Sequence, residues 1–201
     1  MAKLAVLASG NGSNFQAIAQ RLEGTQHVIA CMICDRKAAP VFARAHALGI
    51  PGYRVSYLKA TREEVEQEVL GILNEHRVEL VVLAGYMRLL SSLLVDAYPG
   101  RIVNIHPSLL PSFPGTNAIE ESFESKDYEM GVTVHRVDYG MDTGPVIVQR
   151  SLSRIPGETL EQAEQRIHAL EHQIYPEVVM NILEDIEKSK QFVCESDRRT
   201  L

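Results

Sequence analysis

Residues 104–111 read Asn-Ile-His-Pro-Ser-Leu-Leu-Pro and follow the apolar pair Ile102-Val103. This pattern predicts a buried strand that runs into a stiff loop, because Pro107 favours an extended backbone at His106. Side chains two residues apart on a strand point the same way, so Asn104 and His106 should project side by side. Open α/β sheets bind their ligands at such strand ends. The alternative is a core asparagine and histidine that precede a proline turn.

The composition limits the class of protein. The chain has 201 residues, 45% of them hydrophobic, with a net charge of −6 and three cysteines. This length predicts one domain, and the scattered Lys and Arg residues argue against a large nucleic-acid surface. The first apolar run is too short for a secretion signal, and no run reaches the ~18 residues that cross a membrane. Three cysteines are too few for a disulfide framework, so we expect a cytoplasmic protein.

Short apolar runs alternate with amphipathic patterns along the chain, which predicts an α/β fold. We expect a Rossmann-like, mostly parallel, twisted sheet with helices on both faces. Capping pairs open two of the helices, at Thr61-x-x-Glu64 and Thr159-x-x-Gln162. Pro176 is expected to break or kink the last helix, and residues 187–201 are expected to form a partly ordered tail. Besides the strand before residue 104, strands are expected at 3–8, 27–34, 53–55, 80–84, 131–137 and 146–148.

The first strand ends in Ser-Gly-Asn-Gly-Ser-Asn, residues 9–14, and a helix pattern follows. Backbone N–H groups at a helix start are unpaired and the helix dipole favours negative charge, so this turn predicts an anion site. Phe15 occupies the position of the third glycine of a dinucleotide fingerprint, so a single phosphate is the expected ligand. Asp35 lies at the end of the second strand, where a dehydrogenase would hold a ribose, so a dehydrogenase is a weaker alternative function. A tight turn capped by Ser13 is the structural alternative.

Two patterns contain the residue types that bind metals. Cys31-x-x-Cys34 lies on a predicted strand, where a spacing of three sends the thiols to opposite faces, so we expect two structural cysteines. His168-x-x-Glu171-His172 matches the inverted zincin motif, but no further ligand is evident. We therefore expect no metal.

Two loops contain residues suited to a ligand. Residues 85–90 follow the fourth strand with Gly-Tyr-Met-Arg-Leu-Leu, a mixture that suits a flat heterocycle or a core. Residues 138–145 form a turn-rich loop with two carboxylates. His135, on the strand before this loop, has no partner at a regular spacing and is interpreted as a core histidine.

Three segments together resemble the glycinamide ribonucleotide formyltransferases: residues 9–14, Asn-Ile-His-Pro-Ser-Leu-Leu-Pro-Ser-Phe-Pro-Gly at 104–115, and Asp-x-Gly-x-Asp-Thr-Gly-Pro at 138–145. The resemblance implies formyl transfer from 10-formyltetrahydrofolate to the amine of glycinamide ribonucleotide, in purine biosynthesis. It implies a cytoplasmic enzyme that acts on small molecules, as a monomer or homodimer. Within the single domain, residues 1–100 would be the nucleotide-phosphate-binding half and residues 101–186 the catalytic and folate-binding half.

The resemblance also implies roles for single residues. The catalytic residues would be Asn104, His106 and Asp142. The ribonucleotide would contact Asn11, Gly12, Ser13, Asn14, Pro107 and Glu171. The folate would be held by Arg62, Met87, Arg88, Leu90, Asn104, Asp138, Met141 and Asp142. Members of the family often carry His where this chain has Ile119, so no role transfers to that position.

The chemistry of these residues fits the implied reaction. An amine that attacks a formyl carbon forms an oxyanion, and one preorganised donor such as the Asn104 amide or a protonated His106 stabilises it by about 3–4 kcal/mol. Asp142 could remove the amine proton directly or through a water, and a carboxylate beside His106 favours the imidazolium. The alternatives are formyltetrahydrofolate hydrolysis, formyl transfer to a different amine, and a non-catalytic nucleotide-binding module.

Overall fold

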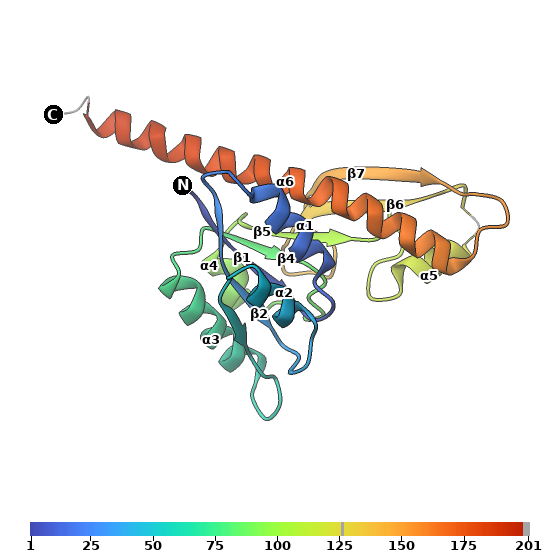
Figure 1. Ribbon diagram of the computed structural model, residues 1–201, viewed down its shortest axis with the longest axis horizontal. Helices are drawn as coiled ribbons and strands as arrows, with labels where there is room; N and C mark the ends of the chain where they lie inside the picture. Colours follow the sequence, from blue (N-terminus) through green and yellow to red (C-terminus); the bar gives the residue numbers. More distant parts are fainter. Residues whose placement is uncertain (126, 199–201) are drawn as a thin grey trace.

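Seven strands form one sheet in the order β3-β2-β1-β4-β5-β6-β7 in the computed structural model, which describes residues 1–125 and 127–198 (Figure 1). The first five strands pair in parallel and the last two in antiparallel fashion. The predicted α/β fold with a mostly parallel sheet is therefore confirmed. The strands are β1 (Lys3–Ala8), β2 (Val28–Cys34), β3 (Gly52–Arg54), β4 (Leu80–Leu83), β5 (Ile102–His106), β6 (Glu129–Arg136) and β7 (Val146–Ser153).

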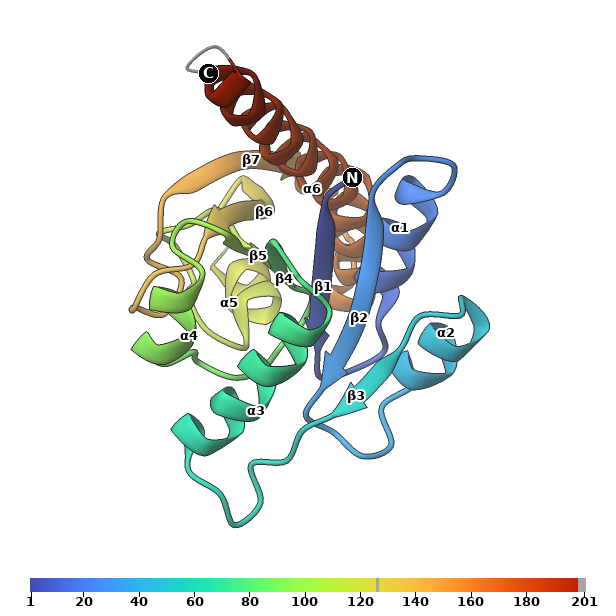
Figure 2. The ribbon, with the colours of Figure 1, turned by 90° about the vertical axis from the view of Figure 1, so that its left-hand side faces the viewer.

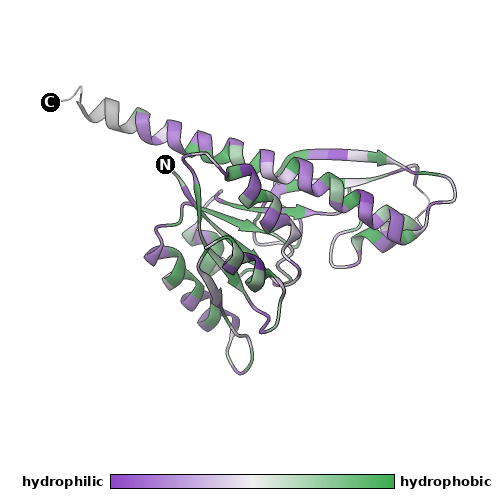
Figure 3. Cartoon of the chain, in the orientation of Figure 1, coloured by the Kyte–Doolittle hydropathy of each residue, from purple (hydrophilic) through white to green (hydrophobic). Residues whose placement is uncertain are grey.

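Helices cover both faces of this sheet (Figure 2). One face packs against α1 (Ser13–Leu22), α2 (Val41–Ala47), α5 (Ala118–Glu124) and α6 (Leu160–Arg198). The other face packs against α3 (Arg62–Glu75) and α4 (Ser92–Ala97). The apolar strands lie between these helix layers, as the hydropathy colouring shows (Figure 3). Both predicted capping pairs form, since Thr61 and Glu64 exchange hydrogen bonds, as do Thr159 and Gln162.

The two faces have separate apolar cores because successive strand residues point to opposite sides. On β1, Leu4 and Val6 belong to one core, while Leu7 belongs to the other. Cys34 and Cys31 divide in the same way, so the prediction that their thiols lie on opposite faces is confirmed. Burial raises the pKa of Cys31 to about 12, so this thiol stays protonated and inert at neutral pH.

The last helix differs from the prediction. It continues through Pro176 to Arg198, so the predicted break is wrong. Residues 187–198, which we expected in a partly ordered tail, belong to this helix. Residues 199–201 lie outside the described residues. A proline inside a helix costs about 3 kcal/mol, and we attribute its tolerance to the buried side chains on both sides of it, including Tyr175 and Val179. Beyond the sheet, Glu187 lies 2.7 Å from the amino group of Met1.

The strand order reverses its direction between β1 and β4. The chain winds outward in opposite directions from these two strands, and ligands of α/β proteins bind at such a switch point. The loops that follow the two strands touch, because the N–H of Ser9 donates to the carbonyl of Gly85 at 3.0 Å. Within the part of the chain that the structure describes, no helix combines the length and apolar character of a membrane span.

Candidate active site

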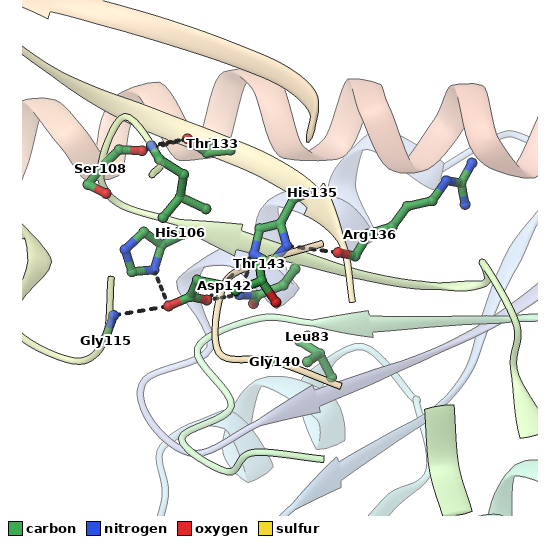
Figure 4. Close-up of polar contacts among 12 residues, drawn as sticks. Leu83, His106, Ser108, Gly115, Thr133, His135, Arg136, Gly140, Asp142 and Thr143 are labelled. Carbon is green, nitrogen blue, oxygen red and sulfur yellow. Dashed lines mark hydrogen bonds and ion pairs between the residues drawn. The ribbon is translucent and has the colours of Figure 1, made fainter. Parts of the chain in front are cut away.

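Asn104, His106 and Asp142 meet at the carboxyl end of β5, as predicted. Nδ1 of His106 lies 3.4 Å from Oδ2 of Asp142, and the Asn104 amide donates to Oδ1 at 3.5 Å. On its other side, Nε2 of His106 lies 2.8 Å from the carbonyl oxygen of Phe113. A carbonyl and a carboxylate can only accept hydrogen bonds, so the doubly protonated imidazolium is the form that satisfies both contacts. Figure 4 shows the His106 ring and the N–H of Gly115 both directed at the same oxygen of the Asp142 carboxylate, Oδ2.

His135 is a site residue that the sequence interpretation missed. In the antiparallel pairing of β5 with β6 it lies directly opposite Asn104. Its Nδ1 bonds the Arg136 carbonyl at 2.8 Å, so Nδ1 is protonated. In the neutral ring Nε2 accepts from Asn104 at 3.2 Å, and in the doubly protonated ring it faces Asp142 at 3.6 Å. The interpretation of His135 as a core histidine describes its burial but omits these contacts.

Asp142 is held as a carboxylate. Burial alone would raise its pKa, but hydrogen-bonding contacts with His135 and the Gly115 N–H, together with the charge of His106, outweigh burial and lower the pKa below its usual 3.8. The residue also has a left-handed backbone, with φ of 56°, which an aspartate tolerates better than most residues. Asp142 is therefore ionised at neutral pH and can accept a proton.

The lowered pKa of Asp142 predicts a specific effect of acid. Its ionisation should stabilise the fold fully above its unfolded value of 3.8 and lose this effect as the pH falls through the lower folded value. Urea unfolding of wild type and Asp142→Asn across about pH 5 to pH 2 measures it, because the other carboxyl groups titrate in both proteins. The advantage of wild type over the variant should shrink as the pH falls. An advantage that stays constant would contradict the lowered pKa.

The loop that carries Asp142 is shaped by tight backbone packing. Oδ1 of Asp138 accepts from the N–H of Gly140 at 3.1 Å and from the Thr143 hydroxyl at 2.7 Å. A Cβ at Gly144 would lie 1.9 Å from the carbonyl oxygen of Arg136, so no larger residue fits there. The Asp-x-Gly-x-Asp-Thr-Gly-Pro pattern thus fixes the backbone from which Asp142 projects.

A pocket of about 210 Å³ opens beside this group of residues. Met87, Arg88 and Leu90, from the loop after β4, line this pocket, and so does Met141. Met87 and Met141 are more than half exposed, so apolar surface is available to a ligand. Of the predicted folate residues, these four and the catalytic residues Asn104 and Asp142 line the pocket, whereas Arg62 and Asp138 are outside its lining.

The predicted phosphate loop lies at the carboxyl end of β1. Gly12 precedes the first residue of α1 with φ of 78°, and its position leaves no room for a Cβ. No acidic residue occupies the first turn of α1, so the positive end of its dipole is not neutralised locally. Arg44, which was not predicted, bonds the carbonyl and side-chain oxygens of Asn11 at 2.9 and 2.8 Å. Arg44 lies on α2, and the packing of this helix against the phosphate loop brings its guanidinium to Asn11.

The remaining predicted nucleotide residues lie at two places. Pro107 directly follows His106 and is half-buried. Glu171, on α6, is buried and accepts from the Asn14 amide at 3.0 Å, so it lies beside the phosphate loop. The same oxygen, Oε2, contacts Nδ1 of His168 at 3.0 Å and raises the pKa of that histidine. Among the described residues no three His, Cys, Asp or Glu side chains converge as a metal site.

The chain is similar to known proteins over most of its length. The chain matches the formyl transferase family over residues 2–179. It is 48% identical to the phosphoribosylglycinamide formyltransferase of Bacillus subtilis (strain 168), over 91% of this chain and 95% of that protein. It is 39% identical to the trifunctional purine biosynthetic protein adenosine-3 of Drosophila melanogaster, over 87% of this chain but only 13% of that protein.

A solved structure gives the same result. The crystal structure of glycinamide ribonucleotide transformylase 1 from Geobacillus kaustophilus matches with a TM-score of 0.86 and 46% identity, over 91% of this chain and 99% of that one. Sequence and structure therefore agree over nearly the whole chain, and the chain belongs to the phosphoribosylglycinamide formyltransferase family.

Proposed function

We propose that the chain transfers the formyl group of 10-formyltetrahydrofolate to the amine of glycinamide ribonucleotide, as a cytoplasmic enzyme of purine biosynthesis. One observation carries the proposal: the anion loop after β1 and the catalytic residues at the carboxyl end of β5 lie at the same edge of the sheet, with β4 between them. Two strand spacings amount to about 10 Å. This separation suits a ribose 5-phosphate whose far end carries the reacting glycinamide.

The nucleotide half of this substrate has a matching set of groups. Its phosphate would bind the N–H groups of residues 11–14, near the guanidinium of Arg44. Glu171 would contact the substrate from α6, next to Asn14. Pro107 would border the reacting end, because it adjoins His106. A phosphate at a helix start fits a ribonucleotide, and Phe15 in place of the third glycine of the dinucleotide fingerprint disfavours a dinucleotide.

The catalytic residues would act on the two charges that form in the reaction. Asn104 and protonated His106 would donate to the oxygen of the tetrahedral intermediate. A formyl oxygen that enters the pocket competes with the Phe113 carbonyl for the Nε2–H of His106. The ionised Asp142 would accept the proton of the attacking amine, directly or through a water, and keep His106 charged. The loss of the amine proton and the gain of negative charge on oxygen would thus be handled by different groups.

The folate would occupy the pocket beside the loop after β4. Met87, Leu90 and Met141 provide apolar surface for the flat pterin. Asp138 would contribute through the loop backbone that it stabilises, since its carboxylate is used within the loop. A contact of Arg62 with the glutamate tail stays a prediction, because this residue is not part of the pocket lining.

A transfer assay tests the proposed function. Purified protein should release tetrahydrofolate from 10-formyltetrahydrofolate only when glycinamide ribonucleotide is present, and the product should carry the formyl group. Equal release in water alone would identify a hydrolase instead. Transfer that requires a different amine would identify a formyltransferase of another specificity. Binding of the ribonucleotide without any release of tetrahydrofolate would identify a non-catalytic nucleotide-binding module.

Activity should not require a metal ion. The glutamate of the His168-x-x-Glu171-His172 motif receives a hydrogen bond from Asn14, which makes it part of the proposed nucleotide site. Prolonged dialysis against a strong chelator should therefore leave the rate of formyl transfer unchanged. If the rate fell and added zinc restored it, metal independence would be refuted.

A further inference from the structure

Asp35 directly follows β2, where a dehydrogenase would hold a ribose, but its carboxylate serves a different purpose here. Its side chain is only 1% exposed, and Oδ2 accepts a hydrogen bond from Nε of Arg88 at 2.7 Å. Its other oxygen is buried without a partner among the described residues. A buried carboxylate with an unpaired oxygen is costly, so its presence calls for a compensating role.

Arg88 is held on two sides while its terminal nitrogens remain free to bind. Its guanidinium carbon lies 4.6 Å from the centre of the Tyr57 ring, and the Tyr57 hydroxyl bonds that of Tyr86 at 2.9 Å. In the part of the chain that the structure describes, Nε is the nitrogen of Arg88 that hydrogen-bonds a protein group. The side chain is 44% exposed and lines the pocket, so the two terminal nitrogens are available to a ligand.

Arg88 is also the one Lys or Arg among the described residues that line this pocket. A folate carries carboxylates on its glutamate tail, and the paired terminal nitrogens of a guanidinium match a carboxylate in two parallel hydrogen bonds. The match requires the guanidinium plane to be fixed in advance. Asp35, which lies outside the pocket lining and binds Nε, is placed to fix it.

We propose that Asp35 is a positioning residue for the formyl donor: it anchors Nε of Arg88 so that the terminal nitrogens receive a glutamate carboxylate of the folate. This inference rests on the proposed function. The role depends on an acceptor oxygen at the position of Oδ2 and not on the negative charge of Asp35. A neutral side chain with an acceptor at the same position could therefore hold Nε equally well.

Steady-state kinetics of three variants tests this role. Asp35→Ala should raise KM for 10-formyltetrahydrofolate roughly tenfold, the loss expected for one charged hydrogen bond, and leave KM for the ribonucleotide unchanged. Asp35→Asn keeps an acceptor and should restore a KM close to that of wild type. Glu158→Ala is the matched control: Glu158 is 3% exposed and bonds the half-buried Arg166 at 2.8 Å away from the pocket, so neither KM should change.

A truncated donor separates positioning from a general structural effect. Without the glutamate, as in 10-formyltetrahydropteroate, Asp35→Ala and wild type should have the same KM. Arg88→Lys, which lacks Nε–H, should impair use of the full-length donor as Asp35→Ala does, and the double variant should be no worse than either. Thermal melts establish that each variant is folded, and Arg88→Lys tests the same contact if Asp35→Ala does not fold.

The inference is overturned if Asp35→Ala leaves the folate KM unchanged, raises both KM values alike, or impairs the truncated donor equally. An Asp35→Asn variant as poor as Asp35→Ala would also overturn it, because charge and not geometry would then matter. Titration of folate binding by calorimetry gives the same comparison without turnover. A failure of the proposed function, seen as no transfer by wild type, is thus distinguishable from a failure of this inference.

Discussion

Asp142→Asn should lower the turnover number at pH 7–8 by about 10²- to 10⁴-fold, the range for loss of a general base. The substitution keeps the shape of the side chain but removes the charge that faces His106 at 3.4 Å and the acceptor for the amine proton. KM for the ribonucleotide should change little, because Asp142 is not part of the phosphate loop. Rapid-quench kinetics would measure the loss of rate in the chemical step. The ¹⁵N chemical shifts of the His106 ring would measure the effect of the lost charge on its protonation.

The double variant supplies the decisive comparison. His106→Ala should be as inactive as Asp142→Asn, and combining the two should cost little more, since residues that act as a unit are not additive. If the two losses multiplied, the residues would act independently. If the His106 ring kept both of its protons in Asp142→Asn, the role of Asp142 in holding that charge would be wrong.

Gly12→Ala should raise KM for the ribonucleotide roughly a hundredfold and leave KM for the folate nearly unchanged. The added Cβ would lie 2.5 Å from Cγ2 and 2.8 Å from Cβ of Val41, and φ is 78°, so the loop must move away from α2. This movement displaces the N–H groups that we assign to the phosphate. Inhibition by free ribose 5-phosphate should weaken in parallel.

Gly24→Ala is the matched control for this prediction. Gly24 has a φ of 74°, close to that of Gly12, but an added Cβ there has no neighbour within 4 Å. The Gly24→Ala variant should therefore have a lower melting temperature, because alanine is strained at this φ, but an unchanged KM for the ribonucleotide. If Gly12→Ala raised both KM values equally, the loop would not be specific for the nucleotide.

The features that could be predicted from the sequence are local ones. A spacing of two placed Asn104 and His106 on one side of a strand, and the cap pairs at Thr61 and Thr159 marked two helix starts. Apolar runs gave most of the strands, because a parallel strand is buried on both faces. The resemblance added Asp142, whose contact with His106 depends on a loop far along the chain.

The features that were missed depend on contacts between distant segments. His135 meets Asn104 through the register of an antiparallel pair, and Arg44 reaches Asn11 through the packing of α2. Neither contact leaves a periodic pattern in the sequence. The predicted break at Pro176 was wrong for the converse reason. The local preference of proline to end a helix was weaker than the packing of α6 on both sides of it.

The arrangement of α6 has a consequence for the geometry of the proposed site. Glu171 contacts Asn14 in the loop after β1, and Tyr175, one helical turn later, places its hydroxyl 2.8 and 3.0 Å from the carbonyl oxygens of Leu83 on β4 and Val103 on β5. One turn of α6 thus contacts both the loop after β1 and the strands β4 and β5. Inserting one residue between Glu171 and Tyr175 would rotate one contact against the other by about 100°. If the loop after β1 binds the phosphate as we propose, its position relative to the strand that carries Asn104 and His106 depends on a helix that supplies none of the catalytic groups.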